Sequence, residues 1–402
     1  MRHLIIQNFG PVKSANLELK SFNFLIGEQS IGKSTIAKLI AIFTDYANLS
    51  TIVAKGIRAW RLRLQMFDLN IYDNTDYRIQ YEYKDNQLHF TISINKNRVI
   101  TSLSENGERV LNKDLMGRRI ASLRIIKHKE DFLKSILNEM QAKDNVDPRY
   151  MILSLQALIE SSLYVPAERI AYSLHDNMKS ALSLLGDSTT YTYRRFMINL
   201  EKARARLKKF ESPLLKMTYL NEEEGQFFID EQSKNKYHLY SASSGIQSSI
   251  PLLLVLEDIK NREYSSIVIE EPETNLFPNT QVEVLRLILE KARVDGRIVT
   301  ITTHSPYLLS ALNNSLYAGY IERVYGKGVL KSLDNILPKE YRLSSIDCSV
   351  YSIGASINGG EYCKSLINDE VGMIDSNSLD KVSFSLSDEF DALQDVVLES
   401  IE

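Results

Sequence analysis

One short segment of the chain has the residue types and spacing of a phosphate-binding loop. It matches the pattern G-x-x-x-x-G-K-[ST] at every fixed position and consists of Gly27, Glu28, Gln29, Ser30, Ile31, Gly32, Lys33 and Ser34. Glycines let main-chain N–H groups approach phosphate oxygens, and a helix that begins here adds the positive end of its dipole. Lys33 can reach the β- and γ-phosphates, and the Ser34 hydroxyl can bind Mg²⁺. We expect the loop, with Thr35, to bind ATP and Mg²⁺; a simple helix cap would not require this lysine and serine.

Two adjacent carboxylates follow a strongly apolar segment. Residues 267–269 read Ile-Val-Ile, which predicts a buried strand, and Glu270 and Glu271 come directly after it. Ligands of open α/β sheets bind at the carboxyl ends of the strands, so both acids should face the phosphates. We expect Glu270 to bind Mg²⁺ and Glu271 to orient and polarise the attacking water. The alternative is a strand that ends in a solvated acidic turn.

A histidine and a serine-rich segment add to this set. His304 follows a predicted strand at 298–301 and is placed to hydrogen-bond a γ-phosphate, although a single histidine is more often structural. Ser243 and Gly245 lie in a segment of small residues that opens a helix, where an anion can bind. A simple N-cap is the alternative there. The predicted catalytic residues are thus Lys33, Glu271 and His304.

The elements that position these residues follow from hydrophobic periodicity. Strands are expected at 4–6, 15–19 and 22–26, a helix at 34–46, a β meander at 76–100 and a hairpin at 227–240. Helices are expected over 115–160 and 171–210, the latter containing a basic helix at 194–209. After residue 248 helices and strands alternate, which indicates a parallel core sheet. The predicted fold class is α/β, with an N-terminal antiparallel β lobe, a mixed core sheet flanked by helices, and a helical insertion.

In this order the motifs resemble the ATP-binding cassette (ABC) superfamily. The phosphate loop corresponds to Walker A, Glu270 and Glu271 to Walker B and its catalytic glutamate, and His304 to the switch histidine. Residues 243–245, Ser-Ser-Gly, resemble a degenerate signature loop. More narrowly, Glu-Glu-Pro-Glu at 270–273 and Thr-Thr-His-Ser-Pro at 302–306 resemble the OLD-like and RecF-like AAA ATPases of bacteria.

Further segments extend this resemblance, and some depart from it. Residues 164–169, Tyr-Val-Pro-Ala-Glu-Arg, lie where transporters carry the Q-loop. Asn275 and Phe277 stand where relatives often have histidines, and Ser244 replaces the first glycine of the signature. The resemblance implies that two copies dimerise head to tail in the presence of ATP. Ser243 and Gly245 of one copy would then act on the nucleotide held by the other, and hydrolysis would separate the heads.

The expected domain plan has one ATPase domain over residues 1–315, with an insertion at about 46–160 and a helical arm at about 171–215. Residues 316–402 are expected to form a C-terminal cap or a partner-docking segment. OLD-type nucleases append a Toprim domain, whose metals require an Asp-x-Asp pair that does not occur after His304. We therefore expect a separate effector protein, a nuclease or a toxin, as in bacterial anti-phage defence.

Charge and composition leave alternatives open. Three basic clusters, at 58–63, 118–129 and 194–209, favour a RecF-like ATPase that binds DNA itself, whereas solvated helix faces would give the same pattern. A transporter cassette is a third, less favoured function. The net charge of −3 gives no general argument for nucleic acid. With two cysteines and no apolar run of membrane-spanning length, we expect a cytoplasmic protein that does not interact with the membrane.

Overall fold

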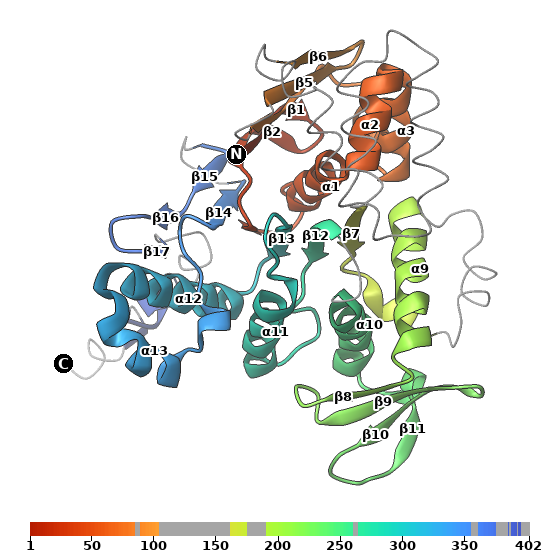
Figure 1. The fold of residues 1–402 in the computed structure, drawn as a ribbon, viewed down its shortest axis with the longest axis vertical. Coiled ribbons are helices and arrows are strands. Elements are labelled where there is room, and N and C mark those ends of the chain that lie inside the picture. The colour runs from red at the N-terminus through yellow and green to blue at the C-terminus, as the bar shows by residue number, and fades with distance from the viewer. Residues whose placement is uncertain are drawn as a thin grey trace, which may run out of the picture.

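The fold was analysed in a computed structural model of the chain. It describes residues 1–84, 89–103, 161–174, 190–259, 264–354, 361–374, 385, 387–391 and 393–394. The helical region expected at 115–160 and the basic cluster at 118–129 lie outside the described residues. Within the described residues the predicted fold class is confirmed, because an antiparallel lobe, a mixed core sheet and flanking helices are all present (Figure 1).

The centre of the molecule is a six-stranded sheet in the order β15–β14–β3–β13–β12–β7. Its strands are β3 (Phe22–Ile26), β7 (Ser161–Val165), β12 (Tyr264–Glu270), β13 (Ile298–Thr303), β14 (Cys348–Ile353) and β15 (Cys363–Ser365). All run parallel except β15, which pairs antiparallel with β14. The strands that precede the phosphate loop, the paired acids and the histidine are β3, β12 and β13, and these three are neighbours. Their carboxyl ends therefore meet at one edge of the sheet.

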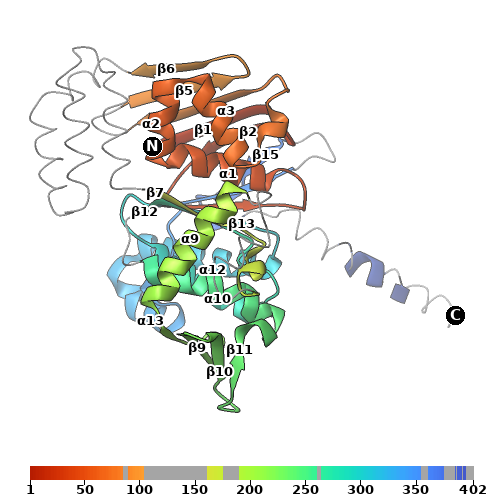
Figure 2. The ribbon, with the colours of Figure 1, turned by 90° about the vertical axis from the view of Figure 1, so that its right-hand side faces the viewer.

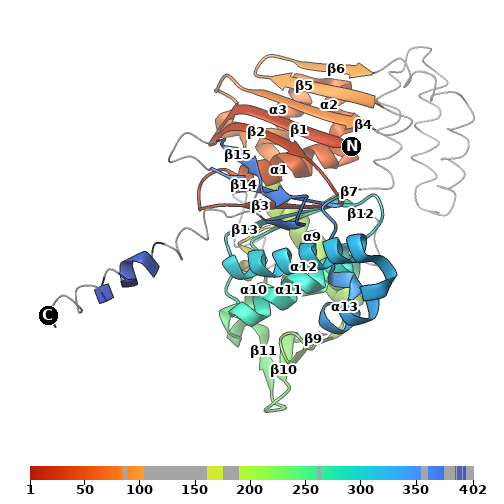
Figure 3. The same ribbon diagram turned by 90° about the vertical axis from the view of Figure 1, so that its left-hand side faces the viewer.

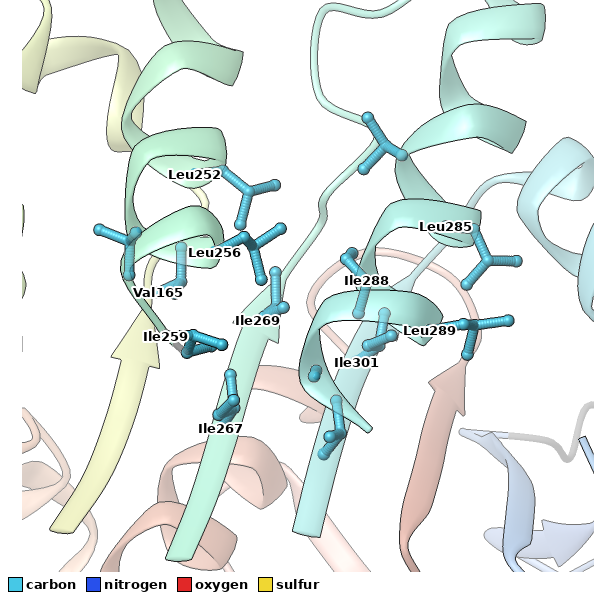
Figure 4. Close-up of a cluster of buried hydrophobic side chains, with 14 of the residues drawn as sticks. Val165, Leu252, Leu256, Ile259, Ile267, Ile269, Leu285, Ile288, Leu289 and Ile301 are labelled. Atoms are coloured by element: carbon cyan, nitrogen blue, oxygen red, sulfur yellow. The ribbon is translucent and has the colours of Figure 1, made fainter. Parts of the chain in front are cut away.

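The residues of β12 alternate between two apolar layers, as a strand that is covered on both faces requires. Ile267 and Ile269 pack with α10 (Ser244–Asp258) and α11 (Pro278–Ala292). Figure 4 shows Leu252 and Leu256 of α10 beside these side chains, and Ile288 and Leu289 of α11 next to Ile301 of β13. Val268 faces the opposite layer. Both layers hold the carboxyl edge of the sheet in place.

The second layer is built from α1 (Lys33–Thr44) and a five-stranded antiparallel sheet, ordered β2–β1–β4–β5–β6. Its strands are β1 (Arg2–Phe9), β2 (Val12–Glu18), β4 (Arg78–Lys84), β5 (His89–Asn95) and β6 (Val99–Leu103). Figure 1 shows α1 between this sheet and the core sheet, beside α2 (Tyr46–Lys55) and α3 (Ile57–Met66). The meander predicted at 76–100 is confirmed, and its first strand pairs with β1. The described part of the expected insertion thus completes the N-terminal lobe.

A helix and a small sheet extend from the side of the core where β7 lies. The helix is α9 (Tyr191–Arg206), which crosses in front of the core in Figure 2. It leads into an antiparallel sheet of β8 (Lys209–Ser212), β9 (Met217–Glu222), β10 (Gly225–Asp230) and β11 (Lys236–His238). The predicted hairpin is confirmed as β10 and β11. Short 3₁₀ helices are η1 (Asn70–Tyr72), η2 (Arg169–Tyr172), η4 (Leu239–Ser241), η6 (Gly326–Val329) and η7 (Lys339–Tyr341).

The C-terminal region differs from the expected division at residue 315. That position falls inside α12 (Pro306–Tyr325), which is followed by α13 (Leu330–Ile336) (Figure 3). β14 then enters the core sheet, where Val350 pairs with Phe24 of β3. A hairpin of β16 (Ile367–Asn368) and β17 (Met373–Ile374) follows. Residues beyond 315 therefore contribute a strand to the core sheet itself, where β3 would otherwise have an unpaired edge.

A buried ion pair fixes α9 to the end of α1. The Asp45 side chain is 1% exposed, and its Oδ2 lies 3.2 Å from Nη2 of Arg195 on α9. The same oxygen accepts a hydrogen bond from the Ser162 N–H of β7 at 3.1 Å. Asp45 thus joins three elements through one carboxylate.

Arg195→Met should destabilise the protein, since it leaves the Asp45 carboxylate buried without its cation. Removing one partner of a buried pair typically costs about 3 kcal/mol of unfolding free energy. Urea unfolding measures this change. Lys202→Met is the matched control, because Lys202 is exposed on the same helix. Equal unfolding midpoints for the two variants would mean that the pair contributes nothing.

Candidate functional site

The phosphate loop has the backbone geometry of an anion-binding nest. Ser30 and Gly32 adopt positive φ angles of 61° and 98°, and Gly32 is the N-cap of α1 with no side-chain cap hydrogen bond. Gly27, with φ 148°, must be glycine, since a Cβ there would lie 2.5 Å from the Ile353 carbonyl oxygen. Residues 28–30 are exposed. The N–H groups of the first turn of α1 are therefore free of a side-chain cap and open to an incoming anion.

Lys33 is folded back onto this loop. Its Nζ donates to the Gly27 carbonyl at 2.7 Å and also to the Glu28 carbonyl, and the residue is only 6% exposed. Burial lowers the pKa of Lys33, while the charges of Glu271, Glu273 and Glu270 act in the opposite direction. These carboxylates are therefore close enough to interact electrostatically with the lysine. Thr35 is buried behind it in the first turn of α1.

Glu270 ends β12 inside the protein. The residue is 5% exposed, and its Oε1 has no hydrogen-bond partner among the described residues. Burial raises the pKa of Glu270, and the nearby Ser34 and Tyr164 hydroxyls partly offset this. A buried carboxylate oxygen without a partner, next to a serine hydroxyl, is an oxygen donor set of the kind that Mg²⁺ prefers. Ser34 and Glu270 therefore fit a magnesium ion.

Glu271 has a backbone conformation that is rare for a non-glycine residue, with φ 42°. Its N–H donates to the Thr302 carbonyl at 3.0 Å. Its carbonyl accepts hydrogen bonds from Nη2 of Arg169 at 2.8 Å and from Oγ1 of Thr274 at 2.8 Å. Such conformations cost about 1–3 kcal/mol and persist where surrounding contacts impose them. The hydrogen bonds to the Glu271 main chain hold its side chain, which is 26% exposed, toward His304.

His304 lies between two carboxylates. Its Nδ1 is 3.5 Å from Oε1 of Glu271 and 3.8 Å from Oε1 of Glu273. The interaction with Glu271 raises the pKa of His304, and the same interaction lowers the pKa of Glu271. Both shifts favour the imidazolium–carboxylate pair in the free protein.

Glu273 was not predicted as a site residue. It is 4% exposed, and its Oε1 accepts hydrogen bonds from Oγ1 of Thr303 at 2.6 Å and from the His304 N–H at 3.0 Å. It therefore holds the segment that carries the histidine. The sequence does show an acid two positions after the predicted catalytic glutamate. The partners of Glu273, however, lie at the end of the neighbouring strand β13, which local sequence does not reveal.

The pKa shift of Glu271 gives a pH test. Since His304 lowers that pKa, His304→Gln should raise it. The Glu271 carboxylate then becomes protonated at a higher pH as the solution is acidified, and the acid limb of the kcat/KM profile should move upward in pH. This profile reports ionisations of the free enzyme. An acid limb at the wild-type position would show that His304 does not control the ionisation of Glu271.

Ser243 and Gly245 lie apart from the phosphate loop, at the start of α10. Ser243 is an exposed N-cap whose side chain makes no cap hydrogen bond. Gly245 packs on the turn after Glu271, and a Cβ there would lie 2.9 Å from the Asn275 carbonyl oxygen. The structure therefore brings together Lys33, Glu270, Glu271 and His304, whereas the described contacts of Gly245 are with its own helix and this turn.

Three arginines of the basic helix predicted as a DNA surface pair with acidic side chains of the protein itself. Arg195 pairs with Asp45, and Arg206 pairs with Asp258. The Arg204 side chain is 4% exposed, pairs with Glu201 and donates to the Tyr172 carbonyl at 2.8 Å. Arg61, from the first basic cluster, likewise pairs with Asp73. Since these arginines have acidic partners within the protein, their number does not by itself indicate a nucleic-acid surface.

Part of the chain is similar to a known ATP-binding protein. A curated protein of Escherichia coli (strain K12), "Probable D,D-dipeptide transport ATP-binding protein DdpD", is 27% identical over 110 residues, which are 27% of this chain and 32% of that protein. The chain thus matches about a third of the length of that relative. Among the described residues, none of the helices combines the length and apolar character needed to cross a bilayer.

Solved structures with similarity to the chain include heads of SMC proteins. The "SmcHead bound to the C-winged helix domain of ScpA" is 13% identical with a TM-score of 0.42, and the match covers 77% of this chain and 90% of that one. The "SMC head domain from Thermotoga maritima" is 11% identical with a TM-score of 0.34, over 77% and 92% of the two chains. Residues 22–310 match the family described as "AAA domain, putative AbiEii toxin, Type IV TA system". This match spans well over half of the chain, so the protein belongs to that AAA family.

Proposed function

We propose that the protein binds and hydrolyses ATP and that two copies form a head-to-tail dimer with composite active sites. The observation that carries this proposal is the meeting of Lys33, Glu270, Glu271 and His304 beside an uncapped helix N-terminus. A cation, a base, a histidine and a row of N–H groups are the parts that phosphoryl transfer to water requires. Membership of an ATPase family supports the same function.

Each residue has a separate task in this mechanism. Lys33 exchanges the Gly27 and Glu28 carbonyls for the β- and γ-phosphate oxygens. Glu271 orients the attacking water, polarises it and accepts its proton as the bond to the γ-phosphorus forms. The bond from that phosphorus to the β–γ bridging oxygen breaks in the same step, and ADP leaves. His304 leaves the Glu271 carboxylate to donate to the γ-phosphate, which frees that carboxylate for the water. ATP binding and activation of the base are thereby linked through one histidine.

The acids of the site differ in protonation behaviour. Burial favours the neutral form of Glu270, whereas His304 favours the ionised form of Glu271. An ionised Glu271 is the form that a general base needs. Ser34 and Glu270 would bind Mg²⁺, which supplies charge neutralisation at the phosphates when it is present.

The second copy completes the site in this proposal. Ser243 of one protomer is exposed and uncapped at a helix start, and it would face the γ-phosphate held by the other protomer. Two identical sites then form across a twofold axis. Because each site needs ATP to bridge the protomers, dimerisation depends on nucleotide and is reversed by hydrolysis.

A mixing experiment tests the composite site. Lys33→Ala should inactivate only the site whose phosphate loop belongs to the same protomer. Ser243→Glu should inactivate only the site whose phosphate loop belongs to the partner protomer, because it places a carboxylate opposite the phosphates held there. Each variant alone is expected to be inactive. Mixing them in equal amounts gives mixed dimers with one intact site, which should restore about a quarter of wild-type phosphate release. A mixture that stays inactive, with wild type active, would contradict head-to-tail sharing.

We propose further that the dimer switches a separate effector, a nuclease or a toxin, in bacterial anti-phage defence. The description of the family, which mentions a toxin–antitoxin system, supports this direction. Two unpaired cysteines agree with a cytoplasmic protein. Copurification from the native operon, with and without ATP, tests the proposal together with phage plating on a deletion strain. Copurification that yields no partner, together with unchanged phage plating on the deletion strain, would contradict the proposal.

A further inference from the structure

Arg169 is the first residue of η2 and follows β7 closely along the chain. It is fully buried, at 0% exposure. Its guanidinium donates to four main-chain carbonyl groups, those of Pro166 at 3.2 Å, Ser248 at 3.0 Å, Glu270 at 2.8 Å and Glu271 at 2.8 Å. One side chain thus connects the end of β7, the start of α10 and the end of β12.

The chemistry of the arginine suits this position. A guanidinium offers five donors in a rigid planar fork, and a lysine ammonium cannot reproduce that geometry. Burial lowers the pKa of Arg169 to about 10, so the group remains charged at neutral pH. The carboxylates of Glu273, Glu271 and Glu270 favour this charge. Arg169 is therefore a second buried cation beside the acidic cluster, after Lys33, and it also binds the main chain of that cluster.

The contact with Glu271 bears on catalysis. Glu271 has φ 42°, and the direction of its side chain depends on this conformation being kept. Thr274 donates to the Glu271 carbonyl from both its N–H and its hydroxyl, but it lies within the same turn. Arg169 supplies the hydrogen bond to that carbonyl from a different part of the protein, so it ties the turn to the rest of the fold.

The contact with Ser248 reaches the helix that begins with the signature-like loop. Ser248 adds a second connection there, because its Oγ donates to the Thr274 carbonyl at 3.0 Å. Gly245 packs against the Asn275 carbonyl without room for a side chain. The first turns of α10 and the turn at 271–275 are thus in close contact, and Arg169 holds the main chain of both.

We propose that Arg169 is a positioning residue that holds the catalytic Glu271 in its strained conformation and couples it to the start of α10. This inference rests on the proposed function, in which the loop before α10 contacts the nucleotide of a second copy. Closure of that copy would shift α10, and Arg169 would transmit the shift to the Glu271 main chain in the same protomer. The base of one site would then respond to occupation of the other.

The test compares two buried arginines. Arg297 is 6% exposed and donates to the Tyr264 and Ala292 carbonyls, near the start of β12 and so at its opposite end from Glu271. Arg169→Lys and Arg297→Lys should lower thermal stability to a similar degree. Only Arg169→Lys should lower kcat for ATP hydrolysis, by about 10- to 100-fold, as expected for a displaced catalytic group. Binding of a fluorescent, non-hydrolysable ATP analogue should be unchanged in both variants.

The outcomes separate this inference from the proposed function. If wild type does not hydrolyse ATP, the proposed function fails; if wild type is active and folded Arg169→Lys has the same kcat, only the coupling role of Arg169 is excluded. A loss of ATP binding in proportion to kcat would indicate a purely structural arginine. Should Arg169→Lys not fold, Arg169→Gln decides, because a glutamine amide cannot donate to all four carbonyls that the guanidinium holds. Wild-type kcat in folded Arg169→Gln would overturn the proposal.

Discussion

Glu271→Gln is expected to lower kcat for ATP hydrolysis by about 10²- to 10⁴-fold, the range that a general base contributes. Glutamine keeps the size of the side chain but cannot accept the proton of the attacking water. ATP affinity should stay the same or rise, since removing a negative charge near the phosphates removes a repulsion. We therefore expect a long-lived ATP-bound dimer, visible as a doubled mass by light scattering.

Glu283→Gln serves as the matched control for this variant. Glu283 is 51% exposed on α11 and pairs with Arg286. It should leave both phosphate release and the mass of the protein unchanged. A Glu271→Gln protein that hydrolyses ATP at the wild-type rate would remove Glu271 from the mechanism and leave Glu270 or Glu273 as the candidate base.

Lys33→Ala should weaken ATP binding by about 10- to 100-fold, the loss that corresponds to about 1.5–3 kcal/mol for hydrogen bonds to charged groups. Two effects act together, because the variant removes the donor to the phosphates and also the cation that faces Glu270, Glu271 and Glu273. The second effect leaves three acids near the negative nucleotide. Titration calorimetry with ATP and Mg²⁺ measures the affinity.

Lys55→Ala is the control for charge alone, as Lys55 is exposed at the end of α2. Its affinity should equal that of wild type at each ionic strength. If both lysine variants bound ATP equally well, the phosphate loop would not be the nucleotide site. If Lys33→Ala bound ATP normally but failed to hydrolyse it, Lys33 would act only in the transition state.

The sequence was sufficient to predict the strands that carry the site. Buried parallel strands are apolar on both faces and are recognised easily, and their carboxyl ends meet by geometry. The sequence therefore predicted that Lys33, Glu271 and His304 lie close together, although they are far apart in the chain. The roles assigned to these residues remain predictions.

Arg169 and Glu273 could not be predicted in the same way. The guanidinium of Arg169 binds main-chain carbonyls, and a main-chain acceptor leaves no trace in the amino-acid sequence. Glu273 binds the N–H of His304 and the hydroxyl of Thr303, so its role depends on the register of β12 against β13. Both residues become interpretable only when the strands are placed side by side.

The basic helix illustrates another limit of local sequence patterns. Closely spaced arginines suggested a surface for nucleic acid, but the acids that neutralise Arg195 and Arg206 are Asp45 and Asp258, far away in the chain. Similarly, all six residues of β14 are buried, but its own sequence does not specify which strand it pairs with. Its pairing with β3 links residues that are remote in sequence, so the boundary expected at residue 315 could not have been corrected from local patterns.

The pairing of β14 with β3 has a consequence for biosynthesis. The phosphate loop is synthesised early, yet Ile353 packs against Gly27 and the Tyr362 hydroxyl donates to the Ile31 carbonyl. At the usual speed of translation the ribosome needs about 15–65 s to pass from the loop to Tyr362. During that interval the nascent chain exposes an incomplete nucleotide site with an unpaired strand beside it. Release of the finished C-terminal region from the ribosome is therefore the step that completes the site.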